Sequence, residues 1–216
     1  MDNGLSKGNL RVLILAPHTD DGEFGCGGSI NRLIAQGHEV LYVAFSAAEK
    51  SVPAEWPPDA LRKEVKAATK ILGIDENNLR ILQYPVRDFL QHRQDILEDM
   101  IRLKRELEPH VVFLPSLNDT HQDHQVVAQE GFRAFKTISM LGYELPWNNL
   151  TFHTNFFVLL QESHIEKKIQ ALECYKSQKD RVYASPEFVR SLARTRGTQI
   201  GSRYAEVFES IRWVWR

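Results

Sequence analysis

Two short clusters of histidine and aspartate are the groups in this chain best suited to chemistry. The first lies in residues 16–23 (APHTDDGE) and the second in residues 118–124 (NDTHQDH). Imidazole nitrogens and carboxylate oxygens are the ligands of catalytic zinc, which takes three of them and keeps a fourth position for water. The two clusters therefore predict a metal-dependent hydrolytic site.

His18, Asp21 and His124 form the predicted set of metal ligands. Two neutral imidazoles and one carboxylate leave a bound Zn²⁺ with about one net positive charge, which lowers the pKa of its water towards ~7. We therefore predict Zn²⁺ as the cofactor. A mixed nitrogen and oxygen site also accepts another divalent transition metal, such as iron, cobalt or manganese.

The remaining groups of the two clusters receive catalytic roles. Asp20 is the unligated carboxylate and the predicted general base for the water proton. His121 precedes His124 by one helical turn, so its ring would lie near the scissile group, stabilise the oxyanion and protonate a leaving amine. Asp123 would accept a hydrogen bond from one of these rings and fix its tautomer.

Other interpretations of the same residues are weaker. The glycines at 22, 25, 27 and 28 resemble a phosphate-binding turn, but their spacing is not that of a dinucleotide motif, and acidic residues lie where the phosphate would bind. The Asp20–Asp21 pair alone could be a helix cap. A lone histidine at a strand end is usually structural, so the histidines outside the two clusters receive no role.

The composition describes an ordinary globular chain. Its 216 residues fit one domain, and 43% are hydrophobic while 25% are charged. A formal net charge of -1 gives no argument for nucleic acid as a partner. No apolar run approaches the ~20 residues of a membrane span. The polar residues 1–9 lack the apolar segment of a signal peptide, so we expect a cytoplasmic protein, with residues 1–8 loosely held.

Alternating strands and helices position the two clusters. The expected strands are 9–16, 38–45, 79–84 and 110–115, and the expected helices are 26–37, 60–72, 92–108 and 125–136. This rhythm predicts an α/β fold with a mostly parallel sheet and right-handed crossovers. Each cluster follows a buried strand, and ligands of such sheets bind at the carboxyl ends of the strands. The clusters should therefore lie together.

The last third of the chain is less regular. We expect a strand in 152–160, helices in 163–178 and 186–195, and either state in 204–213. The segments 46–58 and 139–151 should shape the pocket. Their aromatic residues, Trp147 among them, either stack on a sugar ring or simply pack, and packing is the more frequent role of such residues.

The chain resembles the LmbE/PIG-L-like deacetylases. Residues 17–21 (PHTDD) resemble the P-H-P-D-D signature of that family, and residues 121–124 (HQDH) resemble its H-x-D-H. The R-x-E helix at 62–64 and the G-x-x-x-G-x-x-Y-A-E-x-F tract at 197–208 match as well. The resemblance covers nearly the whole chain and implies a single LmbE-like domain over 1–216, Rossmann-like, with helices on both faces of the sheet.

The resemblance also implies a function. Family members remove an N-acetyl group from an amino sugar or its conjugate with zinc-activated water. The ligand roles fall on His18, Asp21 and His124, the base role on Asp20, and the oxyanion or acid role on His121.

The resemblance further implies that Arg62 contacts the sugar or its attachment, and that the chain assembles as a trimer or hexamer. Asp88, after the third strand, is a further substrate-contact candidate. Two departures from the family pattern stand out: Thr19 replaces a proline, and Gly22 separates Asp21 from Glu23. The role of Glu23 is therefore left open.

Three alternative functions are also compatible with the sequence. The chain could be a zinc amidohydrolase that acts on another N-acylated small molecule, such as an antibiotic or thiol-conjugate precursor. It could also be a non-catalytic metal-binding scaffold, although a scaffold needs neither Asp20 nor His121. A Rossmann-type oxidoreductase is the third rival, and dinucleotide binding would identify it.

Overall fold

The computed structural model describes residues 9–179 and 181–215, so the expectation for residues 1–8 lies outside the described part. The strands are β1 (Arg11–Ala16), β2 (Glu39–Ala44), β3 (Leu79–Ile81), β4 (Val111–Pro115), β5 (Ser139–Tyr143), β6 (Phe156–Leu160) and β7 (Tyr204–Arg212). The α-helices are α1 (Asp21–Ala35), α2 (Ala60–Leu72), α3 (Arg93–Leu107), α4 (Gln122–Ala134), α5 (Glu162–Leu172) and α6 (Pro186–Thr198).

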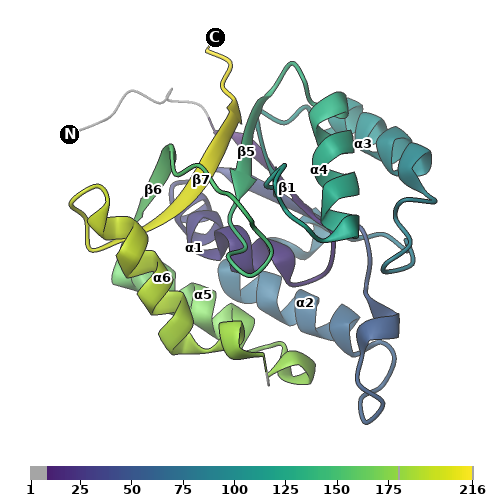
Figure 1. The fold of residues 1–216 in the computed structure, drawn as a ribbon, viewed down its shortest axis with the longest axis horizontal. Helices are drawn as coiled ribbons and strands as arrows, with labels where there is room; N and C mark the ends of the chain where they lie inside the picture. Colours follow the sequence, from purple (N-terminus) through teal and green to yellow (C-terminus); the bar gives the residue numbers. More distant parts are fainter. Residues whose placement is uncertain (1–8, 180, 216) are drawn as a thin grey trace.

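Within the described residues, these strands form a seven-stranded sheet in the order β3-β2-β1-β4-β5-β7-β6. β1 pairs in parallel with both β2 and β4, β2 with β3, and β4 with β5. β7 runs antiparallel between β5 and β6, as Figure 1 shows. The predicted α/β fold with a mostly parallel sheet is confirmed, and the ambiguous 204–213 segment is a strand.

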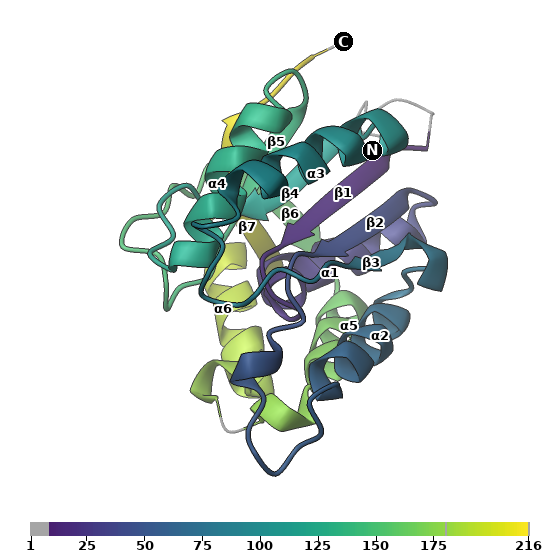
Figure 2. The same cartoon turned by 90° about the vertical axis from the view of Figure 1, so that its right-hand side faces the viewer.

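Helices cover both faces of the sheet. The side chains of β1 alternate, so Val12 and Ile14 pack into one core while Leu13 and Leu15 pack into the other. The first core contains side chains of α1, α2, α5 and α6, and the second contains those of α3 and α4. Figure 2 shows these two groups of helices on opposite sides of the strands. No helix of the described chain is long and apolar enough to cross a membrane.

Local signals set the ends of several helices. α2 ends at Leu72 because Gly73 has φ 95°, a left-handed conformation that glycine adopts without strain. α6 begins with Pro186, and the Ser185 side chain accepts a hydrogen bond from the backbone N–H of Phe188. The predicted helices 60–72 and 186–195 are confirmed, and the second continues to Thr198.

Other boundaries were predicted wrongly. α1 begins at Asp21, five residues before the expected start, and it is kinked at Cys26, so the helix expected over 26–37 corresponds to the part after the kink, which ends at Ala35. The strand expected at 79–84 is regular only over Leu79–Ile81, at an edge of the sheet with a single neighbour. The helix expected at 163–178 ends at Leu172, and its last residues form a separate short 3-10 turn over Lys176–Gln178. The hydroxyl of Tyr175, between the two, donates to the Thr19 carbonyl at 2.7 Å.

β5 is absent from the sequence prediction. Its residues, Ser139–Tyr143, are few and include a glycine, so the alternation signal of a strand is weak. All of them are buried, since β5 lies between β4 and β7. The predicted strand at 152–160 exists over Phe156–Leu160, and the helix expected at 125–136 is α4, which begins earlier at Gln122.

Candidate active site

The two clusters meet because β1 and β4 are adjacent parallel strands. Leu13 pairs with Val112 and Ile14 with Phe113, so the loops that leave both strands emerge at the same edge of the sheet. The β1–α1 loop carries the first cluster and the β4–α4 loop carries the second. The expectation that the clusters lie together is confirmed, since the rings of His18 and His124 are 5.2 Å apart.

Three donor atoms converge in this region. Asp21 Oδ2 lies 3.2 Å from His18 Nδ1 and 3.2 Å from His124 Nε2. The two imidazole nitrogens are 3.3 Å apart. Ligands about 2.0–2.1 Å from a tetrahedral zinc ion are separated by about 3.4 Å. Both the types and the spacing of these donors therefore fit one small divalent cation.

His121 belongs to the same cluster. One ring nitrogen each of His18, His121 and His124 lie within 4.8 Å of one another, so the three histidines form a candidate metal-binding group. The set with Asp21 is tighter. His121 Nδ1 accepts the backbone N–H of Asp123 at 3.2 Å, as the N-cap of α4. A neutral His121 ring therefore carries its proton on Nε2.

Two buried aspartates orient the other histidines. Asp123 Oδ2 lies 2.9 Å from His18 Nε2, and this carboxylate also accepts the backbone N–H of Arg87 at 2.6 Å. Asp119 Oδ2 lies 2.8 Å from His124 Nδ1. A histidine ligand usually donates its second ring N–H to such a carboxylate, which fixes the tautomer and orientation of the ring. Sequence reasoning assigned this role to Asp123 and did not identify Asp119.

Asp20 is buried beside this set and points to a different partner. Its Oδ2 lies 3.4 Å from Arg181 Nη1, in the segment between α5 and α6. Burial, followed by the charge of Asp21, raises the pKa of Asp20 from its ordinary value. Arg181 was not predicted from the sequence, because it lies far along the chain with no motif around it.

The charges of the cluster are strongly coupled. Burial acts to raise the pKa of Asp21, but the imidazoles of His124 and His18 outweigh it and hold that pKa well below its usual range. Burial acts to lower the pKa of His124, yet the carboxylates of Asp21 and Asp119 raise it to about 10. Burial and the neighbouring His124 and His18 lower the pKa of His121 to about 4. His121 is therefore neutral at neutral pH.

Glu23 lies behind the β1–α1 loop. It is completely buried, and burial raises its pKa to about 8. The Tyr175 hydroxyl lies 2.8 Å from Glu23 Oε1 and 2.7 Å from the Thr19 carbonyl. The Tyr42 hydroxyl contacts the same carboxylate and lies 2.9 Å from the same carbonyl. Glu23 and the two tyrosines thus hold the backbone between His18 and Asp20.

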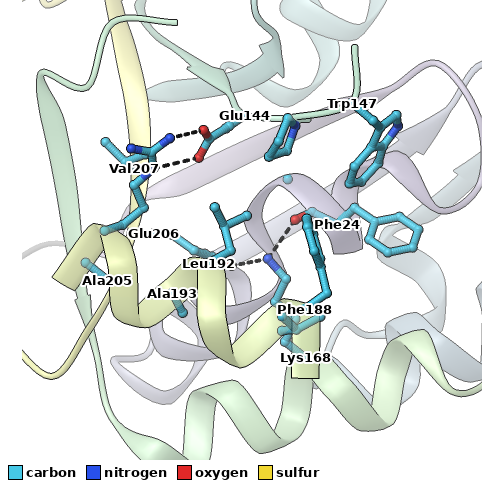
Figure 3. A pocket seen from close by; sticks show the side chains of 14 residues that line it. Phe24, Glu144, Trp147, Lys168, Phe188, Leu192, Ala193, Ala205, Glu206 and Val207 are labelled. Carbon is cyan, nitrogen blue, oxygen red and sulfur yellow. Dashed lines mark hydrogen bonds and ion pairs between the residues drawn. The ribbon is translucent and has the colours of Figure 1, made fainter. Parts of the chain in front are cut away.

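A second buried network supports the start of α1. The helix is kinked at Cys26, which has φ -147° and ψ 21°, and two backbone N–H groups after the kink donate to Glu206 at 3.0 and 2.7 Å. Lys168 Nζ pairs with Glu206 at 2.7 Å and donates to the Phe24 carbonyl at 2.6 Å (Figure 3). Glu206 of the C-terminal tract therefore has a clear role in positioning α1.

The glycines of α1 allow close packing. A Cβ added at Gly22 would lie 2.5 Å from the Tyr42 ring, and one added at Gly25 would lie 2.4 Å from the Tyr143 ring. These contacts explain the glycine-rich sequence without a phosphate ligand.

The two predicted substrate contacts lie outside the histidine cluster. Arg62 Nε pairs with Glu49 at 2.9 Å, in the 46–58 segment. The exposed carboxylate of Asp88 lies 3.9 Å from His92 Nε2. The described side-chain contacts of both residues are therefore with partly exposed ionisable groups, and none is with the candidate ligands.

The cavity in Figure 3 is a separate feature. It lies among α6, β7 and the first turns of α1, and its lining includes Phe24, Trp147, Lys168 and Glu206. None of the histidines of the cluster lines this cavity. We therefore assign the candidate catalytic groups to the histidine cluster and not to this cavity.

Comparison with known proteins gives consistent relatives. The family model of PIG-L, described as GlcNAc-PI de-N-acetylase, matches residues 13–135. The chain is 32% identical to the "Uncharacterized deacetylase YaiS" of Escherichia coli (strain K12) over 183 residues, which cover 80% of this chain and 95% of that protein. It is 25% identical to the "Diacetylchitobiose deacetylase" of Thermococcus kodakarensis over 230 residues, covering 94% and 83%.

Solved structures share the fold. The conserved protein TT1542 from Thermus thermophilus matches with a TM-score of 0.78 and 28% identity, covering 96% of this chain and 97% of that one. GalB, a 4-carboxy-2-hydroxymuconate hydratase from Pseudomonas putida KT2440, also matches with a TM-score of 0.78, at 21% identity, covering 96% and 98%. Because a hydratase has this fold, the fold alone does not define the reaction.

The assignment therefore depends on the sequence matches together with the site. The family model spans both the β1–α1 loop and the β4–α4 loop, which carry the convergent histidines and aspartates. The chain belongs to the PIG-L/LmbE family of deacetylases.

Proposed function

We propose that this protein is a metal-dependent hydrolase that removes an N-acetyl group from an amino sugar or an amino-sugar conjugate. The observation that carries the proposal is the convergence of His18 Nδ1, Asp21 Oδ2 and His124 Nε2 beside an unligated Asp20. Two relatives support the substrate class. One is named a diacetylchitobiose deacetylase, and another a probable N-acetyl-alpha-D-glucosaminyl L-malate deacetylase 2.

The convergent donors would hold the metal ion. Zn²⁺ bound there would act as a Lewis acid that polarises the acetamide carbonyl and acidifies the attacking water. Asp119 and Asp123 orient the two histidine ligands through their second ring nitrogens. The donor set is of the mixed nitrogen and oxygen kind that catalytic zinc takes.

Asp20 and His121 would carry the proton chemistry. Asp20 accepts the proton of the attacking water as general base, and the leaving amine takes its proton from His121, as predicted from the sequence, or from the protonated Asp20. His121 Nδ1 is occupied by the backbone N–H of Asp123, so Nε2–H is the group left to donate to the developing oxyanion. Free amine and acetate are the products.

The test is metal-dependent amine release. Purified protein is depleted of metal, restored with Zn²⁺, and incubated with N-acetylglucosamine, N,N′-diacetylchitobiose, and nucleotide- and lipid-linked N-acetylglucosamine. Free amine is measured with a fluorogenic reagent and acetate with a coupled assay. We expect about one zinc per chain and release that requires it. Zinc binding without release from any acetylated sugar would favour the scaffold, or an amidohydrolase with another acyl substrate.

Asp20→Asn separates catalysis from metal binding. Loss of the base should lower kcat about 10²–10⁴-fold while zinc content stays the same, because Asp20 is not a ligand. Asp95→Asn is the matched control, since the Asp95 side chain is exposed and lies on α3. Full activity of Asp20→Asn with full zinc content would refute the base assignment.

A further inference from the structure

Two aromatic rings from distant segments stack face to face near Asp20. The ring centroids of Trp147 and Tyr183 are 3.8 Å apart, with an interplanar angle of 11°. Phe24 packs edge-on against each ring at 5.3 Å. Trp147 lies between β5 and β6, and Tyr183 lies between α5 and α6. Trp147 and Phe24 lie together at one end of the view in Figure 3.

Arg181 connects this stack to the general base. Its Nη1 lies 3.4 Å from Asp20 Oδ2, and its Cζ lies 5.7 Å from the centroid of the Tyr183 ring. The guanidinium therefore lies between the reacting end of the site and the stack. A small substrate whose scissile amide lies beside Asp20 would therefore extend past Arg181 and place its next group on the stack.

The segment of Trp147 is also tied to the loop of His121. The backbone N–H and the hydroxyl of Thr120 both donate to the Asn148 carbonyl, at 3.0 and 2.9 Å. The stack is thus held from two sides, by the β4–α4 loop and by Arg181. Its orientation relative to the proposed catalytic groups is set by direct contacts.

The surface of the stack combines apolar ring faces with polar groups. Trp147 is 36% exposed although Tyr183 covers one of its faces. Beside it are the Arg181 side chain, which is 39% exposed, and the phenol hydroxyl of Tyr183. A pyranose ring has an apolar C–H face and a rim of hydroxyl groups, which matches this combination. An alkyl chain would gain nothing from the polar neighbours, and Arg181 is already paired with a carboxylate and is a weak site for an anion.

We infer that the Trp147–Tyr183 stack is the binding platform for a second sugar ring, next to the N-acetylated ring that reacts. This inference depends on the proposed deacetylase function and narrows its substrate class to oligosaccharides or glycosides with a pyranose aglycone. Arg181 lies at the junction of the two rings and contacts their hydroxyl groups. Burying one face of a sugar on an indole accounts for about a tenfold gain in binding.

The experiment compares one-ring and two-ring substrates. Amine release from N-acetylglucosamine and from N,N′-diacetylchitobiose is measured for the wild type, Trp147→Ala and Trp147→Phe. Trp147→Ala should lower kcat/KM for the disaccharide about tenfold, mainly through KM, and change the monosaccharide value less than about twofold. Trp147→Phe keeps a flat ring and should recover most of the loss. Trp215→Ala, at a residue 81% exposed, is the control.

Three results would overturn the inference. Equal losses for both substrates would mean that Trp147 only supports the fold. No loss for the disaccharide would remove the platform. A larger loss for octyl N-acetylglucosaminide than for the disaccharide would identify an alkyl chain as the occupant.

A binding measurement separates this inference from the proposed function. If the wild type deacetylates neither these two sugars nor the nucleotide- and lipid-linked forms of N-acetylglucosamine, the proposed reaction fails. Chitobiose, the disaccharide of glucosamine, is then titrated into the protein by ligand-observed NMR. Chitobiose contacts that are present in the wild type and lost in Trp147→Ala would support the platform. Contacts that are absent, or equal in both proteins, would refute it.

Discussion

Asp20 and Asp21 are neighbours in the chain with opposite environments. Asp20 is the N-cap of α1 and Asp21 its first residue, so their side chains leave the backbone in different directions. Asp21 lies between two imidazoles that hold its pKa low, while burial and the charge of Asp21 raise the pKa of Asp20. The start of α1 thus supplies two different carboxylates. Asp21 stays ionised and can bind a metal ion, whereas Asp20 holds a proton more readily.

Asp119 should control metal affinity without touching the ion. Its carboxylate holds His124 Nδ1 at 2.8 Å and also accepts the backbone N–H of His121 at 2.8 Å. Asp119→Ala should weaken zinc binding about 10–100-fold, because the His124 ring loses its orientation and basicity. Competition with a fluorescent zinc chelator measures the affinity. Asp95→Ala, at an exposed position, should bind zinc normally, and equal affinities of both variants would contradict the role of Asp119.

At the scale of elements, α1 is held in place by contacts from several other elements. The Glu206 carboxylate caps its second half, and Lys168 joins that carboxylate to the first half across the kink. Gly22 and Gly25 let two tyrosine rings contact its backbone. The position of the catalytic loop therefore depends on α5, which carries Lys168, and on β7, which carries Glu206.

Lys168→Met should destabilise the fold. The change leaves Glu206 buried without its cation, and breaking a buried pair in this way costs about 3 kcal/mol, the low end of the usual range, because two backbone N–H groups still bind the carboxylate. Urea unfolding measures the free energy of unfolding. Lys167→Met is the matched control, since Lys167 is the exposed neighbour. Equal stabilities of the two variants would disprove the contribution of the pair.

At the scale of the molecule, the site joins two βα units of one sheet. The ligands come from the loops after β1 and β4, and these strands are adjacent only because the chain first builds β2 and β3 on one side of β1 and then crosses to the other. Ligands of open parallel sheets bind where the strand order reverses in this way. A metal ion bound there would link the two halves of the sheet.

Metal removal should therefore lower thermal stability. Zn²⁺ at about 100 times its Kd stabilises the folded chain by about 2.7 kcal/mol. For a chain of this size each kcal/mol changes Tm by about 2–4 °C, so chelation should lower Tm by about 5–10 °C. Calorimetry with and without EDTA measures the change. His18→Gln should show the lower Tm under both conditions, and an EDTA effect of the same size in that variant would contradict the ligand assignment.

The sequence alone determined the donor types, their spacing and the elements that carry them. His18, Asp21 and His124 follow short apolar runs, and this local pattern reports buried strands directly. Only the tertiary structure decided which distant groups complete the site. Arg181 reaches Asp20 across 161 positions, and Tyr175 reaches the Thr19 carbonyl across 156. Such contacts arise from how helices and strands pack, and the periodicity of hydrophobic residues along the chain does not predict that packing. The sequence also did not predict β5 or the position of β7 in the sheet, because the conformation of a buried strand depends on the strands beside it.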